Sequence, residues 1–251
     1  MRTTAIIYMK ELRSFFLSPF AFVVMALFTF INGWLFISTV NAMRVTTIPY
    51  SLVYNVFSSG WFWMGFLFIF PVITMRLFAE EKKTGTFEGL MTAPVRTGEV
   101  LIGKYGAAVT VYLAMLAPLL LFFPVFKMVT GQEDAFHSGA QWGSALILIL
   151  VGIFNIAIGT LASAVTANQL IAAMLTFVGV MLHYFFGFFV GFATLPDSKW
   201  AAGMDYVSTV QHVQLLTQGL IDSRPFVYYL TFSALILSVT WHVIESRKWR
   251  I

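Results

Sequence analysis

Residues 135–196 read AFHSGAQWGSALILILVGIFNIAIGTLASAVTANQLIAAMLTFVGVMLHYFFGFFVGFATLP and contain no Asp, Glu, Lys or Arg. A helix needs about 20 apolar residues to cross a bilayer core, so this stretch is too long for one crossing. The small and polar run from Ser163 to Gln169 divides it near its middle. The stretch therefore predicts two membrane spans, at residues 141–163 and 169–193, joined by a tight turn.

The rest of the chain shows the same long gaps between charged residues. Four further gaps without Asp, Glu, Lys or Arg are bounded by Arg13 and Arg44, by Arg44 and Arg76, by Lys104 and Lys127, and by Arg224 and Glu245. Each gap has room for one span, which we expect at residues 20–40, 58–78, 103–126 and 225–244. A soluble domain is about half apolar and a quarter charged, whereas this chain is 59% hydrophobic and 10% charged. The 251 residues are thus predicted to form one all-α membrane domain with six transmembrane helices.

The basic residues indicate the orientation of these spans, because Lys and Arg gather on the cytoplasmic side of a membrane protein. Six spans place both termini on one side. If that side is cytoplasmic, eleven Lys and Arg lie inside and four, at positions 44, 127, 199 and 224, lie outside. We therefore expect both termini in the cytoplasm, and the basic excess is interpreted as this topology signal, not as a nucleic-acid site.

Two amphipathic segments flank the predicted spans. In residues 3–17, which precede Ser18-Pro19, helical spacing places apolar side chains on one side and Lys10, Glu11 and Arg13 on the other. This pattern favours a helix in the inner membrane interface, with a simple extension of the first span as the alternative. The extracytoplasmic segment 194–224 also has one apolar face, and both a surface position and a reentrant one fit it.

The one sizeable inner loop joins the second and third spans, and residues 76–104 read RLFAEEKKTGTFEGLMTAPVRTGEVLIGK. Gly85 allows a sharp turn, Thr86 can cap a short helix over residues 87–92, and Pro94 ends that helix. Thr97 is expected to cap the helix of the third span, with Glu99 favourable in its first turn. Residues 80–97 are thus predicted to be a folded element, not a linker.

Several patterns that could carry chemistry are incomplete. Residues 98–105, GEVLIGKY, match a phosphate loop except at the last position, which must be Ser or Thr to place a hydroxyl on magnesium. No ATP site is therefore expected in this chain. All eleven acids lie in loops or at the ends of spans, which disfavours a proton-coupled carrier.

No catalytic residue and no metal site are expected. The four histidines lie at different levels of the predicted bundle, and the chain has no cysteine. Ser144 or Ser163 with His183 is the one pair that would suit an intramembrane serine protease, and no strained turn around either serine supports it. Inside the spans, Asn32, Asn155 and His183 either line a substrate path or hold helices together.

The run Glu80-Glu81-Lys82-x-x-Gly85-Thr86-x-Glu88-x-Leu90-x-x-x-Pro94, followed by Gly103-Lys104, resembles the signature loop of type-2 ABC exporter permeases. Residues 205–230 and 235–250 are similar to the gliding-motility-associated permease subfamily, GldF. The resemblance implies a non-catalytic subunit of the bacterial inner membrane, paired with a second permease subunit. A separate ABC ATPase would bind ATP and magnesium.

The same resemblance assigns roles to residues. A coupling helix that docks on the ATPase would be formed around Glu80, Glu81, Gly85, Thr86, Phe87, Glu88, Leu90, Met91 and Pro94. The N-terminal helix with Lys10, Glu11 and Arg13 would help to grip the same ATPase, and the segment before the last span would reenter the membrane. One departure is Gly89, which costs a helix about 1 kcal/mol relative to Ala.

The residues alone leave other functions open. A stand-alone channel or carrier without an ATPase is the first alternative, and an intramembrane enzyme is the second. A membrane protein with a periplasmic domain is a further candidate partner. The substrate is not indicated, because the 27 Phe suit lipid contact, packing and an apolar substrate equally well.

Overall fold

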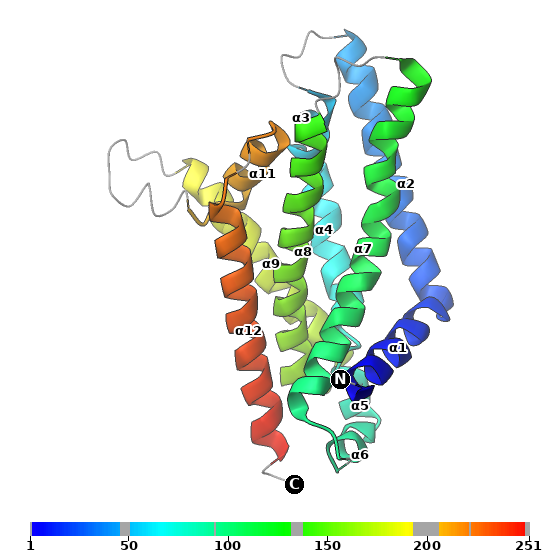
Figure 1. The fold of residues 1–251 in the computed structure, drawn as a ribbon, viewed down its shortest axis with the longest axis vertical. Coiled ribbons are helices and arrows are strands. Elements are labelled where there is room, and N and C mark those ends of the chain that lie inside the picture. The colour runs from blue at the N-terminus through cyan, green and yellow to red at the C-terminus, as the bar shows by residue number, and fades with distance from the viewer. Residues whose placement is uncertain are drawn as a thin grey trace.

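The computed structural model describes residues 2–45, 51–92, 94–131, 138–192, 206–220 and 222–248. In these ranges the chain forms helices and no strand, and the long helices stand side by side as a bundle (Figure 1). The helices are α1 (Arg2–Phe16), α2 (Pro19–Val45), α3 (Leu52–Phe57), α4 (Gly60–Thr74), α5 (Ala79–Lys83), α6 (Thr86–Thr92), α7 (Thr97–Thr130), α8 (Ser138–Val165), α9 (Gln169–Phe192), α11 (Thr209–Thr217) and α12 (Arg224–Lys248).

Five helices are long and apolar enough to cross a membrane, over Ala21–Arg44, Thr97–Thr130, Gly139–Val165, Gln169–Phe186 and Arg224–Ser246. The sixth predicted span, at residues 58–78, is shorter in the structure. There α4 covers only the 15 residues Gly60–Thr74, fewer than the roughly 20 that a full crossing needs. Residues 75–78, Met-Arg-Leu-Phe, leave the helix as turns, so hydropathy overestimated the length of this helix.

Both breaks between adjacent long helices have a local cause. Helix α1 ends at Phe16 and α2 begins at Pro19, which suits the first turn of a helix because proline lacks the amide that would be unpaired there. Between α8 and α9, the side chain of Asn168 accepts the amide of Leu170 at 2.9 Å. The segments 2–16 and 169–192 are therefore separate helices, and α1 lies oblique to α2 (Figure 1).

Helix α8 lies at the centre of the bundle, and its glycines allow its neighbours to approach closely. A Cβ at Gly143 would overlap the backbone of Leu216 in α11, and one at Gly152 would overlap the ring of Tyr112 in α7. The close approach at Gly143 is thus made within the chain, between α8 and α11. Small residues allow such contacts between membrane helices.

The two ends of the bundle differ. Both chain termini lie at the end that carries α1, α5 and α6, whereas α3 and α11 lie at the opposite end (Figure 1). We call these the inner end and the outer end. The inner loop predicted from the sequence is therefore next to the N-terminal helix.

Candidate functional site

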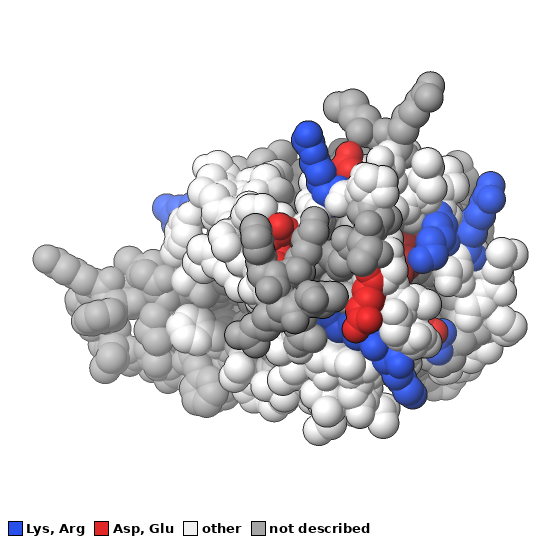
Figure 2. Space-filling model, turned by 90° about the horizontal axis from the view of Figure 1, so that it is seen from below, with Lys and Arg blue, Asp and Glu red and all other residues white. Residues whose placement is uncertain are grey.

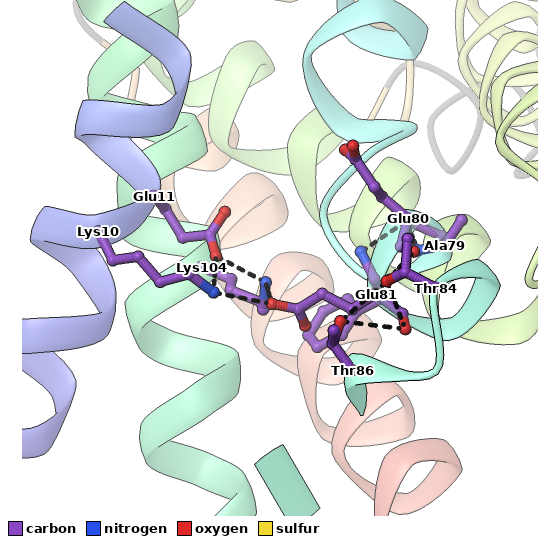
Figure 3. Close-up of polar contacts among 10 residues, drawn as sticks. Lys10, Glu11, Ala79, Glu80, Glu81, Thr84, Thr86 and Lys104 are labelled. Atoms are coloured by element: carbon purple, nitrogen blue, oxygen red, sulfur yellow. Dashed lines mark hydrogen bonds and ion pairs between the residues drawn. The ribbon is translucent and has the colours of Figure 1, made fainter. Parts of the chain in front are cut away.

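Four charged side chains from three separate helices meet at the inner end of the bundle (Figure 3). Lys104 Nζ of α7 lies 2.8 Å from Oε1 of Glu11 in α1 and 3.0 Å from Oε1 of Glu81 in α5. Lys10 Nζ lies 3.1 Å from the same oxygen of Glu81 and 3.7 Å from that of Glu11. We call Lys10, Glu11, Glu81 and Lys104 the inner ion cluster. It connects α1, α5 and α7.

The charges of the inner ion cluster balance, which its burial requires. The side chain of Lys104 is 2% exposed, and those of Glu11 and Glu81 are 12% and 14% exposed. A buried charge needs a partner of opposite sign, because desolvation of an unpaired ion costs several kcal/mol. Partial burial lowers the pKa of Lys10, but attraction to Glu81 and Glu11 outweighs it, so this pKa is raised above the usual value. The cluster therefore favours the charged form of Lys10.

The chain reverses direction between α5 and α6 through a turn that glycine favours. Gly85 has a φ of +73°, in the left-handed region that L-residues with side chains rarely adopt. The hydroxyl of Thr84 donates to the carbonyl of Glu80 at 3.0 Å and lies 2.9 Å from the hydroxyl of Thr86. The predicted sharp turn at Gly85 is present, and α5 and α6 form a hairpin.

Ser163, near the end of α8, holds the start of this hairpin. Its Oγ accepts the backbone amides of Phe78 at 3.0 Å and Ala79 at 3.1 Å. It also donates to the carbonyl of Met75 at 3.3 Å. The first amides of a helix have no partner within that helix, so Ser163 supplies one for α5. Lys82 donates to the carbonyl of Ala164, which attaches α5 to α8 a second time.

Ser163→Ala is expected to loosen the start of α5 by about 1–3 kcal/mol, because two buried amides lose their acceptor. Faster hydrogen exchange at Phe78 and Ala79 would report this loss. The matched control is Ser144→Ala, since Ser144 Oγ only donates to the carbonyl of Ala140 in its own helix. Equal exchange at these amides in both variants would contradict the role of Ser163.

Helix α6 presents an apolar side to the bundle and an acidic side to its surroundings. The ring of Phe87 is buried, with its centroid 6.4 Å from that of Phe78 and 5.2 Å from Lys82 Nζ. Glu88 is exposed, and a Cβ at Gly89 would meet nothing within 4 Å. The inner end seen from below carries both signs of charge (Figure 2). A partner at this face would therefore contact exposed charged side chains such as Glu88, on a helix that the buried ring of Phe87 anchors to the bundle.

The predicted site residues divide into two groups. Lys10, Glu11 and Glu81 come together in the inner ion cluster, whereas Arg13 is exposed and outside it. Glu80 points away from the cluster (Figure 3). The remaining residues of the predicted loop lie along the hairpin or just beyond it: Gly85, Thr86, Phe87, Glu88, Leu90 and Pro94. Met91 belongs to α6, but its side chain lies outside the described part of the chain.

Thr97 does not cap α7, contrary to the sequence-based prediction. The cap is Arg96, whose backbone amide donates to Oε2 of Glu99 at 3.3 Å. The hydroxyl of Thr97 instead donates to the carboxylate of Glu245 in α12. The side chain of Thr97 therefore bonds to a helix that is distant in sequence and does not act as the cap. Glu99, as predicted, stabilises the first turn of α7.

Two of the three polar residues predicted inside spans meet near the outer end. His183 Nδ1 lies 3.1 Å from Oδ1 of Asn155, and Nε2 lies 2.8 Å from the hydroxyl of Thr209. Tyr229 donates to the same hydroxyl at 3.2 Å, so the network joins α8, α9, α11 and α12. Asn32 instead donates to the carbonyl of Phe28 in its own helix. The contacts of His183 therefore connect four helices, whereas that of Asn32 stays within one helix.

Two residues of the site were missed or misread from the sequence. Ser163 was considered with His183 for proteolysis, but its hydroxyl bonds to the start of α5. Lys104 was noted as an inner charge and as part of the signature loop, but no partner was predicted for it. It lies at the start of the predicted span 103–126. Ionisable residues inside membrane spans usually pair with a group of opposite charge or with a backbone carbonyl. An acidic partner for Lys104 could therefore have been predicted from the sequence. Within the described ranges, no three His, Asp or Glu are grouped to hold a metal ion.

A family model described as an ABC-2 family transporter protein matches residues 40–245, more than half of the chain. The chain belongs to the ABC-2 transporter family. Members of this family are membrane components of ABC transporters and generally work with an ABC ATPase. The matched range includes the α5–α6 hairpin and Lys104 but begins after α1, so Lys10 and Glu11 lie outside it. No curated protein matches the chain.

Proposed function

We propose that this ABC-2 transporter chain is a permease subunit that receives motion from a separate ABC ATPase through the α5–α6 hairpin and α1. The observation that carries the proposal is the inner ion cluster, which fixes α5 to both α1 and α7. Force applied to α6 is transmitted to the bundle only if the α5–α6 hairpin cannot move relative to the bundle. Three helices joined by buried ion pairs meet that condition.

The bonds to α8 extend this path through the membrane domain. Ser163 and the carbonyl of Ala164 hold the hairpin to the inner end of α8. At its outer end, α8 contacts α11 through Gly143, and further along the helix Asn155 bonds to His183 of α9, which in turn bonds to Thr209 of α11. Binding of ATP by the partner would shift such a domain between two arrangements, because the hairpin favours one of them when the ATPase closes. ATP and magnesium belong to the partner in this proposal.

The proposed arrangement is a six-crossing subunit of the bacterial inner membrane with both termini in the cytoplasm. The location of both termini beside α5 and α6 supports an even number of crossings, with α4 as the short one (Figure 1). The eleven basic residues on that side support its cytoplasmic position. The C-terminal similarity supports the gliding-motility-associated subfamily, and a second permease subunit would complete the transporter. Its work would be export, or transmission of motion to a membrane protein with a periplasmic domain.

Glu88→Arg tests this proposal because Glu88 is exposed on α6 and has no part in the inner ion cluster. The variant is expected to insert and melt like the wild type but to lose about tenfold in permease-stimulated ATP hydrolysis, the effect of one charge-assisted contact. Stimulated hydrolysis by the co-purified ATPase measures it.

The matched control is Arg224→Glu, a charge reversal at the outer end, where Arg224 is 67% exposed. This variant should leave stimulated hydrolysis unchanged. The proposal fails if Glu88→Arg and Gly85→Pro both couple normally. A chain that always isolates without a nucleotide-binding protein, and that moves solute alone in liposomes, is a channel or carrier instead.

A further inference from the structure

A cavity of about 220 Å³ lies at the inner end, lined by residues of α1, α2, α4, α5 and α7 and of the turns that follow α1 and α4. One part of its wall is apolar, with Val24 and Met25 of α2, Ile73 of α4 and Met115 of α7 among the lining residues. The other part is polar and carries Glu11, Ser14, Ser18, Arg76 and Glu80. The cavity therefore combines one guanidinium, two carboxylates and two hydroxyls with an apolar wall.

The carboxylates of this cavity have acceptor capacity beyond the inner ion cluster. Both ion pairs of Glu11 use its Oε1 atom. Figure 3 shows the second oxygen of Glu11 and the carboxylate of Glu80 both directed away from the cluster. A carboxylate can accept about four hydrogen bonds. Glu11 and Glu80 can thus accept donors from a ligand in the cavity while the inner ion cluster stays intact.

We propose that this cavity binds the headgroup of phosphatidylethanolamine. Its phosphate matches the guanidinium of Arg76, which suits bidentate recognition of phosphate oxygens. Its primary ammonium donates three hydrogen bonds, which match the carboxylates of Glu11 and Glu80. Phosphatidylglycerol has the phosphate but no ammonium, and the ammonium of phosphatidylcholine has no N–H. The charges of the cavity therefore favour one headgroup among common phospholipids.

The size and position of the cavity agree with a headgroup. Its volume of about 220 Å³ lies below the 300–1,000 Å³ of sites that enclose a whole drug-sized ligand. The acyl chains would remain outside, along the apolar face of α2, where Phe22, Val23 and Leu27 are exposed.

A bound headgroup would act on the same helices as the proposed coupling path. It would bridge α1 at Glu11 to the turn after α4 at Arg76, next to the inner ion cluster. The lipid site needs no ATPase, so it goes beyond the proposed function and can be tested apart from it. Failure of the lipid test leaves the coupling test with Glu88→Arg unaffected.

Native mass spectrometry of the purified full-length chain tests the site. Dioleoyl phosphatidylethanolamine, phosphatidylglycerol and phosphatidylcholine are each titrated into the detergent-solubilised protein, and the bound fraction is compared. We expect phosphatidylethanolamine to bind about tenfold more tightly than either other lipid, the effect of one charge-assisted hydrogen bond. Arg76→Gln should lower its affinity by about tenfold. Glu80→Gln should abolish the preference over phosphatidylglycerol.

Two further variants keep the result interpretable. Arg13→Gln is the matched control, because Arg13 is an exposed cation of α1 that does not line the cavity, and it should bind lipid as the wild type does. Ala21→Phe fills the cavity without changing a charge and should abolish the preference even if Arg76→Gln does not fold. Equal binding of all three lipids by the wild type overturns the proposal. So does a preference that survives Ala21→Phe, because such lipid would lie at the general protein surface.

Discussion

Lys104→Met is expected to abolish ATPase coupling and to destabilise the inner end of the bundle by about 3–5 kcal/mol, the usual cost of removing one partner of a buried ion pair. Without the ammonium of Lys104, the carboxylates of Glu11 and Glu81 would share a mostly buried site with only the exposed Lys10 to balance them. Repulsion would separate α1 from α5. A lower melting temperature and a loss of stimulated ATP hydrolysis would report the change.

Two controls test whether the effect of Lys104→Met comes from the unpaired buried carboxylates and not from the loss of any lysine. Lys83→Met changes an exposed lysine of α5 and should leave both stability and coupling near wild type. Lys104→Met combined with Glu11→Gln and Glu81→Gln removes every buried charge of the cluster and leaves only the exposed Lys10 charged, so most of the lost stability should return. A single Lys104→Met variant as stable as Lys83→Met would contradict the importance of the cluster.

Gly152→Ala is expected to destabilise the bundle by about 3 kcal/mol, at the upper end of typical overpacking costs. The added Cβ would overlap the ring of Tyr112, which is fully buried and donates its hydroxyl to the carbonyl of Leu148 at 2.7 Å. The ring cannot swing away without breaking that bond, so α7 must move away from α8. Thermal unfolding in detergent measures the loss.

Gly65→Ala is the matched control for this substitution. Gly65 also lies within a helix, α4, but a Cβ there would meet nothing within 4 Å. Ala is favoured over Gly inside helices by about 0.5–1 kcal/mol, so this variant should be as stable as wild type or slightly more stable. If Gly152→Ala matched it, α8 and α7 would not be in the close contact described.

Sequence patterns predicted the elements that depend on local chemistry. Long charge-free gaps located the helices, and the polar run before Gln169 located the turn between α8 and α9. Gly85 indicated the reversal of the inner loop, because its positive φ is a backbone property of one residue. The family resemblance drawn from this loop agrees with the ABC-2 match over residues 40–245.

Contacts between distant segments could not be predicted in this way. The inner ion cluster draws on positions 10, 11, 81 and 104, and no local period relates them. The length of α4 was overestimated because three of the four residues 75–78 are apolar, yet these residues form turns, and Ser163 accepts the amides of Phe78 and Ala79. Arg96 replaced Thr97 as the cap because Glu245 binds the hydroxyl of Thr97.

Ser163 leaves the ribosome 85 residues after Phe78, the amide of which it accepts. During synthesis, the hairpin therefore emerges well before the hydroxyl that secures its first turn. Lys10 is already present to pair with Glu81, so the side toward α1 can begin to form early. The side toward α8 is completed only once that helix has been inserted. In the proposed coupling role, a nascent chain that stops short of Ser163 would offer the ATPase an unfinished docking element, and assembly of the transporter would wait until most of its membrane domain exists.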